Sequence, residues 1–143
     1  MANTRNTSKK DFVSVAIIYD PVDKLMLLQL RAKNATYSPN KWGFFGGRSE
    51  LNETPEQTLF REIKEETGIE IQSDNTELIN EYKINYDLYR YVFLIKDFPK
   101  NILLNEGQKF NWVSIDKVLG YDLTDRARID VDRFIYALRN PEK

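Results

Sequence analysis

Three glutamates near the middle of the chain have a spacing that could hold a metal ion. On a helix that advances about 100° per residue, Glu62, Glu65 and Glu66 fall within an arc of roughly 100°. Acidic side chains three and four residues apart repel one another and weaken an isolated helix. A bound divalent cation would compensate for this repulsion, because hard cations prefer carboxylate oxygens. Lys64 would point to nearly the opposite side, so it would not neutralise the three glutamates.

The alternative interpretation is a solvated acidic face, which is the common reason for such a cluster on a helix. Two features favour a metal site. The segment follows the glycine pair Gly46 and Gly47, which supplies flexible backbone. It also follows a polar loop with Glu50 and Glu53, whose carboxylates bring further oxygen ligands to the same place.

The chain contains no histidine and no cysteine, which narrows the chemistry that it can perform. The absence of cysteine excludes disulfides, thiolate nucleophiles and cysteine-bound zinc. The absence of histidine removes the commonest general base and the commonest transition-metal ligand. Acid–base and metal chemistry must therefore come mainly from Asp, Glu, Tyr, Lys and backbone groups. Such hard oxygen ligands favour Mg²⁺, Mn²⁺ or Ca²⁺.

Length and charge indicate one globular domain and allow a small anionic ligand, provided that a metal or a few local Arg and Lys residues meet it. The 143 residues fit a single hydrophobic core, and a net charge of −1 provides no basic field for a long nucleic acid. No apolar run approaches the roughly 20 residues that cross a bilayer, and residues 1–11 lack the apolar core of a secretory signal. We therefore expect a cytoplasmic protein with no membrane partner, a flexible tail at residues 1–11 and a single domain at residues 12–143.

Strands and helices must position the glutamates. Apolar and β-branched runs predict strands at residues 12–19, 25–30, 42–45, 77–85, 88–95 and 110–113, and a short extended segment at 69–71. The strand at 42–45 is expected to end at the glycine pair. The pattern favours a mixed sheet with helices packed on its faces.

The glutamate segment has strong helix signals over residues 55–67. Thr54 is a suitable N-cap, Gln57 completes a capping box, and Gly68 is a natural stop. A short helix is expected at residues 115–119. A final amphipathic helix is expected at residues 124–138, and its predicted apolar side comprises Ile129, Phe134, Ile135 and Leu138.

The stretch from Gly47 to Ile69 resembles the Nudix box, G-x5-E-x7-R-E-U-x-E-E-x-G-U, in which U is a bulky aliphatic residue. The residues that fill its nine specified positions are Gly47, Glu53, Arg61, Glu62, Ile63, Glu65, Glu66, Gly68 and Ile69. Five of these nine are charged, so the match is far more specific than a lone glycine motif.

The resemblance implies an α/β fold, the Nudix α/β/α sandwich, with a central mixed β-sheet and the box as a loop–helix–loop. In that family the glutamates at the positions of Glu62, Glu65 and Glu66 hold catalytic Mg²⁺ or Mn²⁺. The position of Arg61 usually orients neighbouring carboxylates. Glu53 commonly organises the loop and in some members contacts the metal.

The resemblance also implies residues for the substrate. Gly46 and Gly47 would let backbone approach the metal and the phosphates, so both are substrate-binding candidates and Gly47 is a metal-site candidate. Arg31 resembles a phosphate-contacting arginine of MutT-type members, although a solvated arginine at a strand end is an equal alternative. Asp125 lies where relatives often place a base-recognition residue, but helix N-capping is its simpler interpretation.

A second segment, Asn105-Glu106-Gly107-Gln108, lies about 40 residues beyond Glu66. It resembles the E-G-Q segment of MutT-type Nudix enzymes, which hydrolyse nucleoside triphosphates including oxidised purine forms. Their glutamate is a metal ligand or a base, so Glu106 is a candidate for that role. A plain glycine turn before a strand is the alternative.

Two positions depart from the pattern of many relatives. Phe45 stands where they have proline before the glycine pair, and Asn52 replaces the usual glycine before the loop glutamate. Asparagine tolerates left-handed backbone, so we expect the turn at Asn52 to survive.

The sequence therefore predicts a magnesium-dependent hydrolase that cleaves a pyrophosphate bond in a nucleoside triphosphate or a related nucleoside diphosphate derivative. A metal-activated water would attack phosphorus. The candidate catalytic residues are Glu53, Arg61, Glu62, Glu65, Glu66 and Glu106. An ADP-ribose or nucleoside diphosphate-sugar pyrophosphatase is the first alternative. A catalytically silent, nucleotide-sensing Nudix module is disfavoured because every box carboxylate is present. The identity of the general base and the choice between monomer and homodimer stay open.

Overall fold

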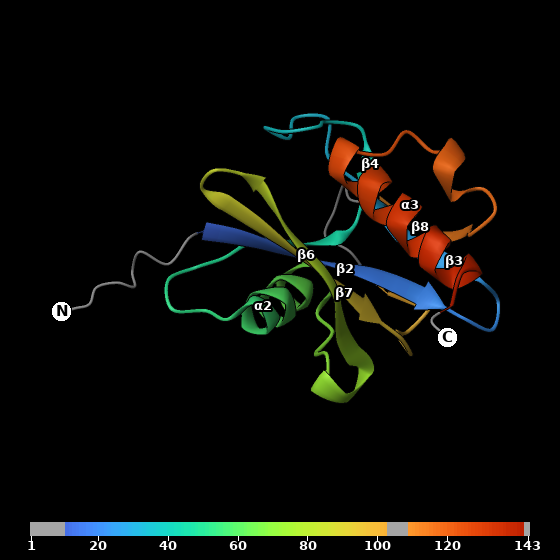
Figure 1. The fold of residues 1–143 in the computed structure, drawn as a ribbon, viewed down its shortest axis with the longest axis horizontal. Coiled ribbons are helices and arrows are strands. Elements are labelled where there is room, and N and C mark those ends of the chain that lie inside the picture. The colour runs from blue at the N-terminus through green and yellow to red at the C-terminus, as the bar shows by residue number, and fades with distance from the viewer. Residues whose placement is uncertain (1–10, 103–108, 142–143) are drawn as a thin grey trace.

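The computed structural model describes residues 11–102 and 109–141. Residues 1–10, which make up most of the predicted tail, and the candidate Glu106 lie outside the described residues. The described chain folds into a mixed β-sheet with one helix on each face (Figure 1). This arrangement is the α/β layering that the sequence predicted.

The sheet contains seven strands within the described ranges. They are β2 (Asp11–Asp20), β3 (Leu25–Leu30), β4 (Trp42–Gly43), β5 (Phe45–Arg48), β6 (Thr76–Asn85), β7 (Leu88–Ile95) and β8 (Lys109–Ser114). The order is β4-β3-β2-β7-β6, with β5 paired to β2 and β8 paired to β3. β2 and β7 are parallel, whereas the other neighbouring pairs are antiparallel.

Strand β2 is central to the fold and to the position of the glycine pair. It is almost entirely buried because it has strands on both edges and a helix over each face, which explains its unbroken apolar sequence. Its second half continues through a turn into β3, and its first half pairs with β5. The β2–β5 register places Gly46 opposite Val15 and Gly47 opposite Ser14.

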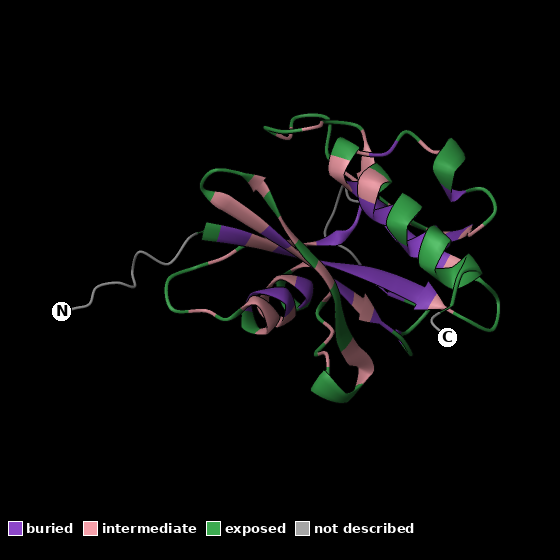
Figure 2. Ribbon diagram, viewed as in Figure 1, coloured by how far each residue is buried: buried purple, intermediate pink, exposed green. Residues whose placement is uncertain are grey.

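Alternation along β2 separates two hydrophobic clusters. Val15 and Ile17 face helix α3 (Asp125–Arg139), whereas Ala16 and Ile18 face helix α2 (Pro55–Thr67). Both helices turn their buried side toward the sheet and their exposed side outward (Figure 2). Two 3₁₀ helices, η1 (Ser73–Asn75) and η2 (Val118–Gly120), complete the described elements. Across the described ranges, no helix has both the length and the apolar character needed to span a membrane.

One expected short helix is shorter than predicted. The helix expected at residues 115–119 is the 3₁₀ helix η2 at Val118–Gly120, and residues 115–117 form a turn that leads into it. The cause is the Ile115 amide, which donates to the Lys24 carbonyl (2.9 Å) and so continues the pairing of β8 with β3. Residues 69–71, which were expected to be short and extended, belong to no strand of the described sheet, and Ile69 and Ile71 pack against the cluster under α2.

The ends of two other elements also differ from expectation. The strand expected at residues 42–45 is divided into β4 and β5, and β5 continues through Gly46 and Gly47 because both glycines pair with β2. On α3, the predicted apolar side is wrong at Leu138, which is 43% exposed at the edge of a hollow between α3 and strands β6 and β7. Ile129 is only partly buried. The buried side comprises Ala127, Asp130, Val131, Phe134 and Ile135.

Candidate active site

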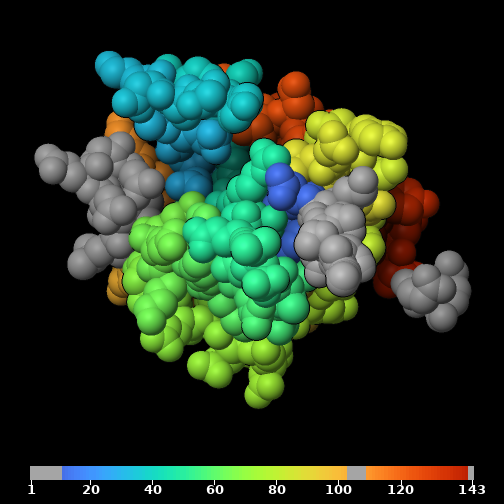
Figure 3. All heavy atoms as spheres, turned by 90° about the vertical axis from the view of Figure 1, so that its left-hand side faces the viewer, coloured from blue at the N-terminus to red at the C-terminus, as the bar shows by residue number. Residues whose placement is uncertain are grey.

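Helix α2 carries the three clustered glutamates and begins and ends as its local signals predict. The Thr54 hydroxyl accepts the Gln57 amide (3.1 Å), and the Gln57 side chain accepts the Thr54 amide (2.9 Å), which completes the capping box. At the other end, Gly68 takes a left-handed conformation with φ of 79°. The helix and the loop before it face the same side of the molecule as the loop that precedes β4 (Figure 3).

Packing fixes the direction in which the acidic edge of α2 points. Leu59 and Ile63 are fully buried against the sheet and anchor the helix. The hydroxyl of Ser14 on β2 donates to the Pro55 carbonyl (2.8 Å), so it ties the first turn of α2 to the central strand. The acidic edge therefore lies beside the glycine pair, which β2 also holds.

The two glycines allow the carboxylates to approach the backbone closely. The Gly46 amide donates to Glu66 Oε1 at 3.1 Å. Gly46 has φ of 143°, and a Cβ at this position would overlap the Ser14 carbonyl oxygen. A Cβ at Gly47 would overlap the Glu62 carboxylate instead. Glu62 thus occupies space that only glycine at position 47 leaves open, whereas glycine at position 46 lets β5 approach the backbone of β2 closely.

Gly47→Ala is expected to displace Glu62 and to lower turnover by roughly 10- to 100-fold, because small misplacements of catalytic groups are costly. Steady-state kinetics with saturating Mg²⁺ measures the effect. Gly120→Ala is the matched control, since a Cβ there would meet nothing within 4 Å. Equal turnover in both variants would contradict the assigned contact between Gly47 and Glu62.

Arg61 connects the loop to the acidic edge of the helix. Its Nε donates to Glu53 Oε2 at 2.6 Å, and its Nη2 donates to the Arg48 carbonyl at 2.9 Å. Its Nη1 donates to Glu62 Oε2 at 2.9 Å and lies 3.4 Å from Glu65 Oε1. A single planar guanidinium therefore fixes carboxylates from the loop and from the helix in one arrangement.

The carboxylates differ in their electrostatic environment. The hydrogen bond from Arg61, together with those from Thr58 and the Glu50 amide, lowers the pKa of Glu53 to about 2. Burial raises the pKa of Glu66 to about 8, and the neighbouring charge of Glu62 adds to the shift. Burial also raises the pKa of Glu62, although Arg61 opposes it. Negative charge on Glu62 and Glu66 is thus not fully balanced by the protein.

The lowered pKa of Glu53 predicts an acid-dependent contribution to stability. Its pKa falls from 4.5 to about 2 on folding, so its contribution is fully present above about pH 4.5 and is lost as pH falls toward 2. Glu53→Gln should therefore be less stable than wild type at neutral pH, with a difference that shrinks below pH 4.5. Urea unfolding at several pH values measures this difference, and a constant difference down to pH 2 would refute the prediction.

The donors along this edge suit a hard divalent cation. Glu62, Glu65 and Glu66 offer carboxylate oxygens, and a cation would relieve the unbalanced charge. Within the described ranges, however, no three acidic side chains are grouped closely enough to hold a metal ion. Glu66 is bonded to the Gly46 amide, and the other two glutamates contact Arg61. Binding a cation through all three glutamates therefore requires the side chains of Glu65 and Glu66 to move toward Glu62.

The family model of the NUDIX domain matches residues 9–137 of the chain. The chain belongs to the NUDIX family. This match confirms the resemblance that the box residues indicated.

Relatives of this Nudix chain share both sequence and fold. A CTP pyrophosphohydrolase from Escherichia coli K12 is 28% identical over 116 residues, covering 76% of this chain and 80% of the relative. An 8-oxo-dGTP diphosphatase from the same organism is 32% identical over 108 residues, covering 75% and 82%. The MutT structure from Methanosarcina mazei Go1 superimposes with a TM-score of 0.72 at 25% identity, covering 92% and 95%. The predicted fold class and the prediction of a Nudix hydrolase enzyme are confirmed.

The two substrate-binding candidates away from the glycine pair, Arg31 and Asp125, lie in different parts of the chain. Arg31 follows directly after β3 and donates through Nε to the Tyr37 carbonyl (2.8 Å). It is close enough to Glu66 for its positive charge to lower the pKa of that residue. Asp125 is exposed at the start of α3, and Thr124 rather than Asp125 caps this helix by accepting the Ala127 amide. Arg31 is therefore near the acidic edge. The capping interpretation of Asp125 is wrong.

The two departures from the usual Nudix pattern have clear local effects. Phe45 is 1% exposed and packs in the cluster under α2, so it adds to the core at the end of the loop. Asn52 has φ of 69°, which confirms that asparagine supports the left-handed turn expected there.

The sequence interpretation missed two buried hydroxyls of this Nudix site, Ser14 and Thr58. Both are 0% exposed, and both hydrogen-bond to the loop or first turn that carries the box. A sign of each was available. Ser14 is the lone polar residue in the apolar run FVSVAIIY, and Thr58 adjoins the apolar Leu59 on the packed side of α2.

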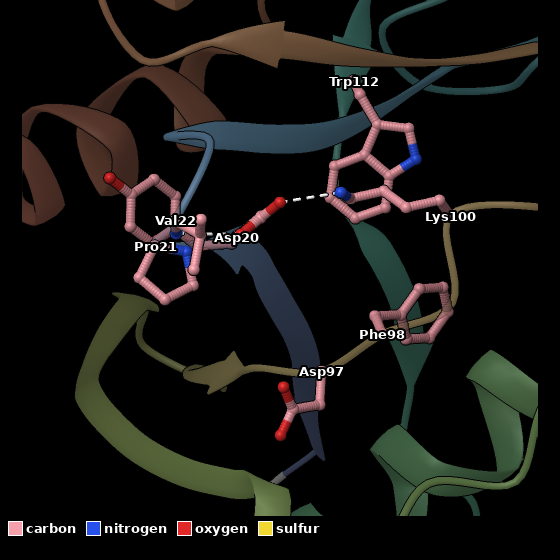
Figure 4. A pocket seen from close by; sticks show the side chains of 8 residues that line it. Asp20, Pro21, Val22, Asp97, Phe98, Lys100 and Trp112 are labelled. Carbon is pink, nitrogen blue, oxygen red and sulfur yellow. Dashed lines mark hydrogen bonds and ion pairs between the residues drawn. The ribbon is translucent and has the colours of Figure 1, made fainter.

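A separate hollow of about 220 Å³ lies near the far end of β2, between the β2–β3 turn and β8 (Figure 4). Across it, Lys100 pairs with Asp20 at 2.7 Å and lies 5.4 Å from the centre of the Trp112 ring. Because Lys100 and Asp20 pair with each other and the remaining acidic lining residue, Asp97, is exposed to solvent, the hollow has no acidic cluster comparable to that of α2.

Proposed function

We propose that this Nudix enzyme hydrolyses a nucleoside triphosphate to a nucleoside monophosphate and pyrophosphate, with Mg²⁺ as cofactor and Mn²⁺ as a substitute. The observation that carries the proposal is the pair of carboxylates, Glu62 and Glu66, held against the glycine pair with raised pKa values. The names of the two E. coli relatives, an 8-oxo-dGTP diphosphatase and a CTP pyrophosphohydrolase, support the substrate class.

Glu62, Glu65 and Glu66 are the proposed cation ligands, and Glu106 is a further candidate ligand or base. When bound, the cation would neutralise phosphate oxygens and make a water easier to deprotonate. Because the chain has no histidine, the proton of the attacking water would pass to a carboxylate or be lost from the metal-bound water itself. Attack at phosphorus then breaks the pyrophosphate bond.

The remaining residues would place the polyphosphate. Gly46 and Gly47 leave the backbone open beside the carboxylates, so phosphate oxygens can approach it. Arg31 adds a positive charge close to Glu66, where it would meet a phosphate. Asp125 is proposed to bind the nucleobase of the substrate. It lies at the start of α3, which begins beside β4, since the Thr124 amide donates to the Trp42 carbonyl (2.9 Å).

A product-release screen tests the proposal. Purified protein is incubated with Mg²⁺ or Mn²⁺ and with nucleoside triphosphates, including oxidised purine forms, as well as ADP-ribose and nucleotide sugars. Pyrophosphate and nucleoside monophosphate are expected from at least one triphosphate. Preferred turnover of ADP-ribose or a nucleotide sugar would replace the proposed substrate class. No turnover with either metal would favour the silent sensing module.

A further inference from the structure

Thr58 is a buried residue of α2 whose hydroxyl bonds to a group outside the helix. Its side chain is 0% exposed, and its Oγ1 donates to Glu53 Oε1 at 2.6 Å. Thr67 in the same helix shows the usual alternative, because its hydroxyl donates to the Ile63 carbonyl four residues earlier (2.8 Å). The Thr58 hydroxyl thus donates its hydrogen bond to a loop carboxylate instead of to a carbonyl of its own helix.

The contacts of Glu53 leave its carboxylate a single orientation. Oε1 accepts from Thr58, from the Glu50 amide at 2.9 Å and from Arg61 Nη2 at 3.1 Å, whereas Oε2 accepts from Arg61 Nε at 2.6 Å. Bonds to an ionised acceptor are short and strong. The Thr58 bond comes from the rigid helix core, so it fixes Glu53 relative to the body of the domain.

Arg61 transmits this position to the acidic edge. Its guanidinium is planar, so its bonds to Glu53 determine where Nη1 lies. Nη1 donates to Glu62 Oε2 at 2.9 Å. The hydrogen bonds therefore run from Thr58 through Glu53 and Arg61 to a carboxylate that is proposed to bind the cation.

We propose that Thr58 is a positioning residue for the cation site, which acts through Glu53 and Arg61 on Glu62 and touches neither substrate nor cation. The inference rests on the proposed metal-dependent function. It adds a residue at a position that the box pattern leaves unspecified. Without the Thr58 hydroxyl, Glu53 would keep only its bonds from the long Arg61 side chain and from the Glu50 amide of its own loop, so Arg61 would hold Glu62 less firmly in one place.

The pair Thr58→Val and Thr58→Ser separates the hydroxyl from the packing. Valine keeps the branched shape of threonine without the hydroxyl that donates the hydrogen bond, and serine keeps that hydroxyl. We expect Thr58→Val to raise the Mn²⁺ dissociation constant by about 10- to 100-fold, as for other partners that orient metal ligands, and Thr58→Ser to stay close to wild type. Electron paramagnetic resonance titration of Mn²⁺ without nucleotide measures this constant independently of turnover.

Thr67→Val is the matched control, because it removes a hydroxyl of α2 that does not contact Glu53. It should keep the wild-type Mn²⁺ affinity. A purely structural role of Thr58 would lower the melting temperature of Thr58→Val and leave its Mn²⁺ affinity unchanged, which would overturn the inference. If Thr58→Val does not fold, Thr58→Ala is compared with Thr58→Ser in the same way.

The titration also separates this inference from the proposed function. A wild-type protein that binds Mn²⁺ but hydrolyses no nucleotide would end the proposed function, while the Thr58 variants would still decide the positioning role. Turnover by wild type with equal Mn²⁺ affinity in the Val and Ser variants would overturn only the role of Thr58. A wild-type protein that does not bind Mn²⁺ would overturn both.

Discussion

Glu66→Gln is expected to lower kcat by about two to four orders of magnitude while the fold stays intact, and Glu65→Gln should act in the same direction. The amide keeps the size of the side chain but removes the negative charge that a cation requires. At position 66, burial raises the pKa of the carboxyl to about 8 and so already disfavours its charged form, which means that a neutral amide should not lower stability. Single-turnover kinetics measures the loss of rate, and circular dichroism measures whether the fold and its stability are kept.

Glu56→Gln is the control for these variants, because Glu56 lies in the first turn of the same helix and is absent from the acidic edge. It should retain nearly the wild-type kcat. Near-normal rates in both Glu65→Gln and Glu66→Gln would contradict their assignment as cation ligands. A large loss in Glu56→Gln would mean that the helix as a whole, and not its acidic edge, is sensitive to substitution.

Asp130→Ala is expected to reduce the free energy of unfolding by about 3–5 kcal/mol, because it leaves a buried charge without its partner. The Asp130 side chain is 0% exposed on α3 and accepts Arg90 Nη2 at 2.7 Å and Nε at 2.9 Å. It also accepts the Tyr82 hydroxyl at 2.7 Å. The three residues join α3 to strands β6 and β7, on the face of the sheet opposite to α2.

Asp132→Ala on the exposed side of α3 is the matched substitution and should change stability by less than about 0.5 kcal/mol. Denaturant unfolding compares the two variants. Below its melting temperature, Asp130→Ala should keep the wild-type kcat, since the buried pair lies across the sheet from the acidic edge. Equal stability of the two alanine variants would show that the Arg90–Asp130 pair contributes nothing to the fold.

The helix of the candidate site could be predicted from the sequence because its signals are local. Thr54, Gln57 and Gly68 lie within one turn of the helix ends that they define, and all three act as expected. The spacing of Glu62, Glu65 and Glu66 likewise needs only helical geometry. The sheet could be predicted as mixed, because long apolar runs alternate with turns and two helical segments.

The contacts that fix the site could not be predicted, because they join residues that are distant in sequence or compete with local alternatives. The Ser14 hydroxyl bonds 41 residues away and Arg90 bonds 40 residues away. Thr58 bonds only five residues away, but a helical threonine usually bonds within its helix. The continuation of β5 through the glycine pair was missed for a related reason, since its pairing with β2 is a tertiary interaction.

A crystal structure of the protein with Mg²⁺ and a non-hydrolysable nucleoside triphosphate would show directly whether the glutamates of α2 hold a cation beside the phosphates. We predict Mg²⁺ at about 2.1 Å from carboxylate oxygens of Glu62, Glu65 and Glu66, between α2 and the phosphates. We also predict that Glu66 has turned away from the Gly46 amide. Phosphates bound elsewhere, with these glutamates directed into solvent, would contradict this placement of the cation.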